Sequence, residues 1–405
     1  MYITPNLPEC MGTSDSVSIQ NAVDLASARG WNRVVIPRLN QRTGECLWII
    51  DSAVLLPDGM HIVLEDCTLR QADGCFDNVF RNKNLYTEGP SYRAEQKDIR
   101  ISGVGNAVID GGVHNGLTEF TSETEGYPHI SQNNMILFHN VDGFVIENLT
   151  LRNPRWWAIH LMYASNGRIS NITVDAKDDV INQDGIDLRV GCHNISITDV
   201  FGHSGDDLIA LSGFLGYEKR KGFLVEGKCL DIHAVSIRNV VGTAVSKAVV
   251  ALRNHDGIRL YDVTIDGVID TSGDGRGHHP YAIVRIGQKD YYNVRPSEAG
   301  ETSRIFVQNV HAAHGDAVMV NVTLTDSVIE NIFCGPQARS AFSTRSDWPH
   351  LLPGAYMRNV SIRGIYCDEN NDSAAEMIEI IDGEPGVDGQ ENVFFSDVYL
   401  PKKGE

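Results

Sequence analysis

A short phrase of the form Ile-x-Asn/Asp-Val recurs along the sequence and constrains the fold more than any other feature. Successive copies begin 23, 28, 40, 23, 47 and 22 residues apart, so the step is about 22 to 23 residues, sometimes lengthened by an insertion and once doubled. Repetition at a fixed step and in a fixed order predicts a stack of similar coils. The copies begin at Ile146, Ile169, Ile197, Ile237, Leu260, Val307 and Ile329.

A second short apolar segment lies between the phrases, with alternating apolar residues as expected of a strand that has one buried face. Two or more strands per repeat, joined by Gly, Asn and Asp turns, cannot enclose a core alone and must stack on their neighbours. We therefore expect an all-β parallel β-helix, because a β-sandwich needs shorter hairpin spacing and no repeated phrase. The segments are Ile159–Leu161, Ile186–Leu188, Ile209–Leu211, Val250–Leu252, Ile283–Ile286 and Val318–Val320.

The N-terminal part carries the one long helix that the sequence predicts. Ser14 or Asp15 can cap it, Gly30 can end it, and apolar residues between them keep roughly helical spacing. Such a helix can cover the open end of the apolar column. We expect a single domain over residues 1–405, with a cap region over about residues 12–60.

Composition limits the partners of the chain. The 405 residues carry a formal net charge of −19, which repels nucleic acids and anionic membranes. No apolar segment reaches 18 residues, and no basic region with an apolar run opens the chain. The eight scattered cysteines lack metal-like spacing and are expected to be mostly buried thiols, which favours a reducing, cytoplasmic location. A secreted or periplasmic chain that has lost its signal peptide would look the same, and the oligomeric state is open.

Three carboxylates precede two of the apolar segments. Asp184 stands before Ile186–Leu188, and Asp206 and Asp207 stand before Ile209–Leu211, 22 residues later. If 22 residues are one repeat, these acids lie side by side on neighbouring coils. Asp-Gly and Gly-Asp pairs are also ordinary turn formers, so a purely structural role is the alternative.

The same stretch resembles a known family of enzymes. Asn182-Gln183-Asp184 and Gly205-Asp206-Asp207 resemble the Asn-Thr-Asp and Gly-Asp-Asp motifs of polygalacturonases, glycoside hydrolase family 28. Upstream, residues 153–160 (Asn-Pro-Arg-Trp-Trp-Ala-Ile-His) resemble its Pro-x-Trp-x-Ile-His coil, and the resemblance runs in order over roughly residues 12–290. It implies a single-stranded right-handed parallel β-helix and hydrolysis of a glycosidic bond with inversion, in a pectin-related polysaccharide or oligosaccharide.

Inverting hydrolysis needs one carboxylic acid to protonate the leaving oxygen and a second carboxylate, about 6.5 to 9.5 Å away, to activate water. Crowded acids repel one another when ionised, so at least one keeps its proton above the usual range. By resemblance, Asp206 is the acid, and Asp184 and Asp207 hold the water. The resemblance implies no cofactor and no metal.

The sequence departs from the family after these motifs. Aligning Val250–Leu252 with the preceding segments places Lys247 where the family has the histidine of Gly-His-Gly. The family's Arg-Ile-Lys reads Arg285-Ile286-Gly287, so the arginine stays and the lysine is lost. Arg285 can still clamp a substrate carboxylate, and Lys247 can supply a second cation. The identity of the sugar is therefore open.

Further substrate contacts are expected from Asn182, Trp157 and His160. Aromatic faces stack on sugar rings. Of Trp156 and Trp157, in alternate positions, one should point inward to the core. His160 either supports the acids or pairs with a neighbouring coil. Insertions over residues 214–230, 271–281 and 288–303 are expected to form walls of the cleft.

Two other functions fit parts of the sequence. Pectate lyases are also β-helices, and Asp184, Asp206 and Asp207 are hard oxygen ligands of the kind that Ca²⁺ prefers. A non-catalytic carbohydrate-binding β-helix that has lost its activity would explain the departures at Lys247 and Gly287.

Overall fold

The computed structural model describes residues 1–85, 94–216, 222–273, 279–289, 295–346, 353–371, 377–381 and 388–400. The chain divides into two compact units: residues 1–187 with 221–228 form unit 1, and residues 188–220 with 229–405 form unit 2. The expected single domain stays a prediction. Of the insertions expected to line a cleft, residues 217–221, 274–278 and 290–294 lie outside the described residues.

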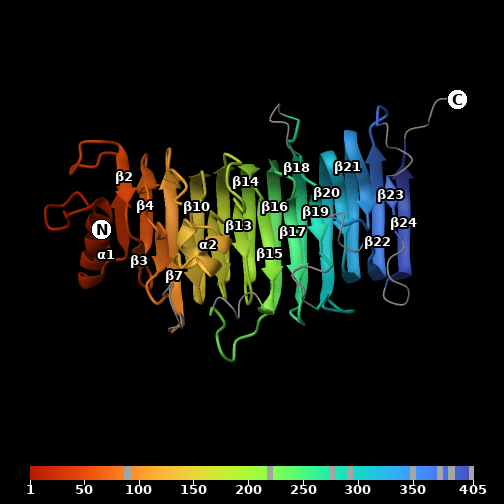
Figure 1. Ribbon diagram of the computed structural model, residues 1–405, viewed down its shortest axis with the longest axis horizontal. Helices are drawn as coiled ribbons and strands as arrows, with labels where there is room; N and C mark the ends of the chain where they lie inside the picture. The colour runs from red at the N-terminus through yellow and green to blue at the C-terminus, as the bar shows by residue number, and fades with distance from the viewer. Residues whose placement is uncertain are drawn as a thin grey trace. The chain divides into compact units, whose positions relative to one another are not determined.

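Unit 1 is built from three parallel sheets that the chain visits in turn (Figure 1). The first contains β1 (Arg33–Ile36), β4 (His61–Glu65), β7 (Gln96–Val104), β10 (Val141–Arg152) and β12 (Ser165–Asp175). The second contains β2 (Leu47–Ile50), β5 (Thr68–Gln71), β8 (Val108–Asp110) and the end of β10. The third contains β3 (Val54–Leu56), β6 (Phe80–Asn82), β9 (Ile136–His139) and β11 (Ile159–Met162).

Unit 2 continues the same construction with longer strands. Its first sheet contains β14 (His193–Ser204), β16 (Ile232–Ala244), β18 (Leu260–Asp270), β20 (Thr302–Val320), β21 (Thr323–Ser343), β22 (Tyr356–Cys367) and β24 (Gly389–Tyr399). The second contains β15 (Ile209–Gly213), β17 (Ala248–Asn254), β19 (Ala282–Ile286), the ends of β20 and β21, and β23 (Ile378–Glu379). The short β13 (Ile186–Leu188) spans the boundary of the units. The predicted fold, a right-handed parallel β-helix, is confirmed.

The repeated phrase has a backbone explanation. The third residue of every copy has a positive φ of 53° to 59°, and these residues are Asn148, Asn171, Asp199, Asn239, Asp262, Asn309 and Asn331. Asn and Asp enter this left-handed region more readily than other residues with a side chain. The apolar first and fourth residues on either side are buried, at 0–2% exposure. The phrase is therefore a bend that keeps apolar side chains pointing into the column on both sides.

One copy was assigned to the wrong register. Leu260 pairs with Ile232, whereas Ile237 pairs with Ile265, and Ile265 in turn pairs with Val307. The equivalent phrase is therefore Ile265 to Val268, with Gly267 at the left-handed position at a φ of 76°. The expected doubled step is wrong: one coil of 42 residues runs from Ile265 to Val307.

The N-terminal helix α1 (Asp15–Ala28) lies beside the first strands, as expected of a cap (Figure 1). The Ser14 hydroxyl accepts a hydrogen bond from the N–H of Val17, and Gly30 follows the helix at a φ of 66°. Asp15 ties the helix to the sheet, because its carboxylate accepts hydrogen bonds from Asn40 at 2.7 Å and from the N–H of Ile49 at 2.8 Å.

Two short helices were not expected from the sequence, α2 (Glu119–Thr124) and the 3₁₀ helix η1 (Ile130–Asn133). Thr118 and Thr121 form a capping box at α2, a local signal that was available. Among the described residues, no helix has the length and apolar character to cross a membrane.

All eight cysteines lie in the described residues and are free. Four of them are buried, two are partly exposed and two are exposed, so the expectation of mostly buried thiols holds for half of the set. The buried ones are Cys10, Cys67, Cys192 and Cys334.

The left-handed bend predicts a specific pattern of stability. Asn171 has a φ of 53° and its side-chain amide donates to the Asn148 side-chain oxygen at 2.9 Å. We expect Asn171→Ala to lower the free energy of unfolding by about 1 kcal/mol more than Asn171→Gly, because only glycine has no Cβ to strain this conformation. Denaturant unfolding of both variants measures the difference. Equal losses would mean that the hydrogen bond, and not the backbone, stabilises the bend.

Candidate active site

The register of two neighbouring strands in unit 2 brings two acids and a lysine together. Ile209 of β15 pairs with Val250 of β17, an offset of 41 residues that places Asp206 opposite Lys247. The Lys247 Nζ lies 3.7 Å from Asp206 Oδ2. The sequence alignment that put Lys247 at this place on the coil is therefore confirmed, and the cation is close to the predicted acid.

Asp207 is fully buried and accepts four hydrogen bonds. Its Oδ1 accepts from the N–H of Ala248 at 2.9 Å and from Arg285 Nη2 at 3.2 Å. Its Oδ2 accepts from Arg253 Nη2 and Arg285 Nη2, both at 2.9 Å. A carboxylate has about four acceptor positions, so those of Asp207 are filled by the protein itself.

Asp206 is 6% exposed and has a different environment. Its Oδ1 accepts a hydrogen bond from the N–H of Asp207 at 2.9 Å, and the Ser204 hydroxyl donates to its backbone carbonyl at 2.6 Å. These bonds hold the turn, and they leave Oδ2 directed towards Lys247.

The two neighbouring acids have pKa values shifted in opposite directions. Burial raises the pKa of Asp206, and the negative charge of Asp207 raises it further, against a smaller opposing effect of Lys247, Arg253 and Arg285. Burial also acts to raise the pKa of Asp207, but Arg285, Arg253 and Lys247, with the Ala248 N–H, outweigh it and lower that pKa. Asp206 therefore holds a proton in a pH range in which Asp207 is ionised. A pair separated in this way can donate a proton.

Arg253 was missed in the sequence. It pairs in register with Ser212 and stands two residues after Ala251, which itself pairs with Arg285 on the next strand. Arg253 and Arg285 therefore reach Asp207 from consecutive strands. The available signal was a charged residue near the end of a strand whose other residues are apolar.

Arg285 is 2% exposed and its described partner is Asp207. The guanidinium faces a carboxylate of the protein and has little contact with solvent, and the expected clamp on a substrate carboxylate stays a prediction. Lys247, with a side chain 25% exposed, is the accessible cation beside Asp206.

The first acid motif lies in unit 1, in the loop before β13. Asn182 takes a left-handed φ of 63°, and Gln183 is buried, with its Nε2 donating to the Pro154 carbonyl at 2.9 Å. Asp184 is 2% exposed, and its backbone carbonyl accepts from the N–H of Ala158 at 3.0 Å. The motif is thus anchored by its backbone and by Gln183 to the preceding coil.

Both tryptophans are buried, and the sequence predicts a core role for at least one of them. Trp156 and Trp157 are 2% and 6% exposed, and their rings stack with centroids 3.9 Å apart. They lie in the loop between β10 and β11, where the alternation of a strand does not apply. The core role is confirmed, and Trp157 presents little ring surface to a sugar.

His160 is 1% exposed and contacts a neighbouring coil. Its Nδ1 lies 3.1 Å from the side-chain oxygen of Asn134, and its ring packs edge-on against Trp157 at 4.8 Å. These contacts match the alternative in which His160 pairs between coils. Its support of the acids stays a prediction, as does substrate binding by Asn182.

Comparison with known proteins assigns the segment that carries all three acids. Residues 76–216 match the family model described as glycosyl hydrolases family 28. The expected resemblance is therefore confirmed over these residues. The match includes the Trp-Trp coil, Asp184, Asp206 and Asp207, and ends before Lys247 and Arg285.

Two named relatives are similar to part of this chain. An Aspergillus niger protein named as a galacturan 1,4-alpha-galacturonidase C is 32% identical over 223 residues, which are 50% of this chain and 52% of that protein. A Vitis vinifera protein named as a polygalacturonase is 30% identical over 192 residues, or 44% of this chain and 36% of that protein. The chain thus spans about half or less of these relatives.

Solved structures share the fold at low sequence identity. A family 28 exopolygalacturonase of Yersinia enterocolitica superposes with a TM-score of 0.53 at 12% identity, over 98% of this chain and 78% of that one. The tailspike protein of the Escherichia coli bacteriophage HK620 superposes with a TM-score of 0.59 at 12% identity, over 92% and 65%. These likenesses show the β-helix alone.

Asp207 is poorly suited to bind a divalent cation. Both oxygens of that carboxylate already accept from guanidinium groups, and Arg253 and Arg285 would repel a cation placed there. A Ca²⁺ ion needs several oxygen ligands, and these two guanidinium groups disfavour Asp207 as one of them.

The filled acceptor positions of the Asp207 carboxylate lead to a prediction about stability. We expect Asp207→Asn to lower the free energy of unfolding by about 3 kcal/mol, because it removes the buried carboxylate that contacts two largely buried guanidinium groups. Asp206→Asn is the matched control and should change stability little, since burial already favours the neutral form of that residue. Denaturant unfolding at neutral pH distinguishes the two.

The difference in the free energy of unfolding between wild type and Asp207→Asn depends on pH in a defined direction. Since the folded pKa of Asp207 is lowered, its contribution is complete above the unfolded-state pKa and is lost as the pH falls through the folded pKa. The gap between wild type and Asp207→Asn should therefore shrink on acidification. A gap that stays constant would contradict the assignment of the lowered pKa to Asp207.

Proposed function

We propose that this protein is an inverting glycoside hydrolase that cleaves a glycosidic bond in a pectin-related polysaccharide or oligosaccharide. The observation that carries the proposal is the pair Asp206 and Asp207, adjacent buried acids with pKa values shifted in opposite directions within a family 28 segment. The names of the two relatives, a galacturonidase and a polygalacturonase, support a galacturonate-containing substrate.

Asp206 is the proposed general acid. A general acid must hold its proton until the glycosidic oxygen leaves, and the raised pKa of Asp206 meets this need. Asp206 is 6% exposed, and its Oδ2 lies 3.7 Å from the Lys247 Nζ. Lys247 is positioned to compensate negative charge that remains on Asp206 after the proton is transferred.

Asp184 is the proposed base that activates water. It precedes Asp206 by 22 residues, which is one step of the repeat, and it ends the Asn-Gln-Asp motif. An inverting enzyme needs this second carboxylate on the opposite face of the bond. The repeat spacing and the family 28 match support the assignment.

Asp207 has a different proposed role from the one expected from the sequence, which was to hold the water together with Asp184. Because Arg253, Arg285 and the Ala248 N–H fill its acceptor positions, we assign it to positioning. Its fixed negative charge next to Asp206 helps to keep the proton on the acid.

A single assay tests the reaction. Wild-type protein incubated with polygalacturonate should release reducing ends without forming unsaturated uronate, and proton NMR of the first product should show the inverted anomer. We expect Asp206→Asn to lower kcat by about 10²- to 10⁴-fold, the usual contribution of a general acid. Asp184→Asn should lose activity to a similar extent.

Other outcomes would overturn the proposal. Unsaturated uronate that disappears with a chelator would establish the lyase alternative, and binding without any product would establish the non-catalytic one. An Asp206→Asn variant as active as wild type would remove Asp206 from the acid role.

Lys247 provides a prediction about the pH profile. Its cation lowers the pKa of Asp206, so Lys247→Met should raise that pKa. Hydrolysis requires the protonated acid, and activity is lost as the pH rises through its pKa. The alkaline limb of kcat against pH should therefore move to higher pH in Lys247→Met. If the alkaline limb moves to lower pH in this variant, the group that titrates there is not Asp206.

A further inference from the structure

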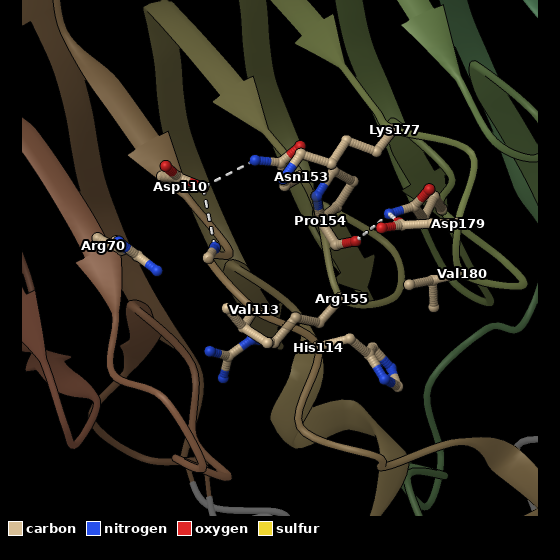
Figure 2. A pocket seen from close by; sticks show the side chains of 12 residues that line it. Arg70, Asp110, Val113, His114, Asn153, Pro154, Arg155, Lys177, Asp179 and Val180 are labelled. Atoms are coloured by element: carbon tan, nitrogen blue, oxygen red, sulfur yellow. Dashed lines mark hydrogen bonds between the residues drawn. The ribbon is translucent and has the colours of Figure 1, made fainter.

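A polar pocket of about 430 Å³ opens in unit 1, next to the loop that carries Asp184 (Figure 2). It is lined by the ends of successive coils: the turn after β8, the loop between β10 and β11, and the loop before β13. Gln183, the residue before Asp184, forms part of its wall. The pocket therefore belongs to the same edge of unit 1 as the proposed base.

Three cations line this pocket in a strongly acidic chain. Arg70, Arg155 and Lys177 come from three different segments, and Figure 2 shows the Arg70 guanidinium directed across the pocket. Lys177 is exposed at its edge. Among the described residues, Arg70 forms an ion pair with Asp73 at 3.4 Å, and this pair is weak because it is long and the Asp73 side chain is 71% exposed.

The acids that line the pocket do not cancel these charges. Asp110 accepts from the N–H of Gly112 at 2.8 Å, from Asn153 at 3.2 Å and from Arg152 at 3.3 Å. Arg152 thus compensates Asp110. Asp179 is the other acid among the lining residues. The lining therefore carries three cations and one acid, Asp179, whose charge is not compensated by another residue named above. Its net positive charge attracts an anion.

Arg155 is the observation that points to a ligand. It is 1% exposed, and its guanidinium donates to backbone carbonyls of Cys75 and Ala72, both at 2.9 Å. Among the described residues, no group accepts a hydrogen bond from its Nε. A buried guanidinium held by neutral carbonyls retains its whole charge, and a buried unpaired donor is costly. An anion in the pocket would offset both.

We propose that this pocket binds the carboxylate of a uronate unit in the substrate chain, at a distance from the bond that is cleaved. The inference rests on the proposed function, whose substrate is a polymer with a carboxylate on successive sugars. Arg70 and Lys177 reach the carboxylate from the rim, and Arg155 supplies positive charge from below. Pro154 and Val180 give apolar surface on which the sugar ring can rest.

The test measures binding and not turnover. Hexagalacturonate is titrated by calorimetry into the Asp206→Asn protein, in which hydrolysis is suppressed, and into the same protein with Arg70→Ala, Lys177→Ala or the control Lys97→Ala, an exposed lysine of β7 outside the pocket. We expect Kd to rise about 5-fold in each pocket variant, corresponding to about 1 kcal/mol for a partly solvated charge pair, and to stay unchanged in the control. Fully methyl-esterified hexagalacturonate should bind equally to all four proteins.

The outcomes separate this inference from the proposed function. If the sugar is hydrolysed by wild type but Kd is unchanged in both pocket variants, the proposed carboxylate site is wrong and the proposed hydrolase function is unaffected. If binding weakens in both pocket variants but no sugar is cleaved by wild type, the proposed hydrolase function is wrong and the carboxylate site is supported. The site would be overturned if the Asp206→Asn protein does not bind hexagalacturonate, or if the pocket variants lose the same affinity for the esterified form. Circular dichroism of each variant checks folding.

Discussion

The left-handed bend that recurs in successive coils, as at Asn171, Asp199 and Asn239, is the constraint on which the rest of the structure depends. A parallel stack works only if each coil turns at the same place, because otherwise the apolar residues on both sides of the bend would leave the column. Asn, Asp and, at residue 267, Gly provide that turn at low cost. The side chains then link coils directly, as in the hydrogen bonds from Asn171 to Asn148 and from Asn331 to Asn309.

The same register assembles the site. Once β15 and β17 pair, Asp206 meets Lys247, and once β17 and β19 pair, Arg253 and Arg285 converge on Asp207. No loop has to close to bring these groups together. The electrostatic separation of the two acids is therefore a property of the scaffold, and it is present before any substrate binds.

The parts of the molecule that the sequence predicts are those governed by local backbone preference. The phrase predicted the coils, and Ser14 and Gly30 predicted the ends of the helix. The error at Leu260 has the same origin: glycine at residue 267 serves the bend but does not match a pattern written for Asn and Asp. The role of Arg285 could not be predicted, because its partner depends on which strands pair and which side chain is buried. The contact of Arg253 with Asp207 was not predicted for the same reason. The position of Lys247 was predicted from the alignment of the strands alone.

Coil length and coil register are independent in this protein. The coil from Ile197 to Ile237 takes 40 residues and the one from Ile265 to Val307 takes 42, yet the strands pair in step across both. An insertion between strands therefore lengthens the connecting loop without altering the register in which the strands pair. This separation lets a lineage acquire new substrates by exchanging loops, while selection on the folding of the column continues to act on a few bend and core positions.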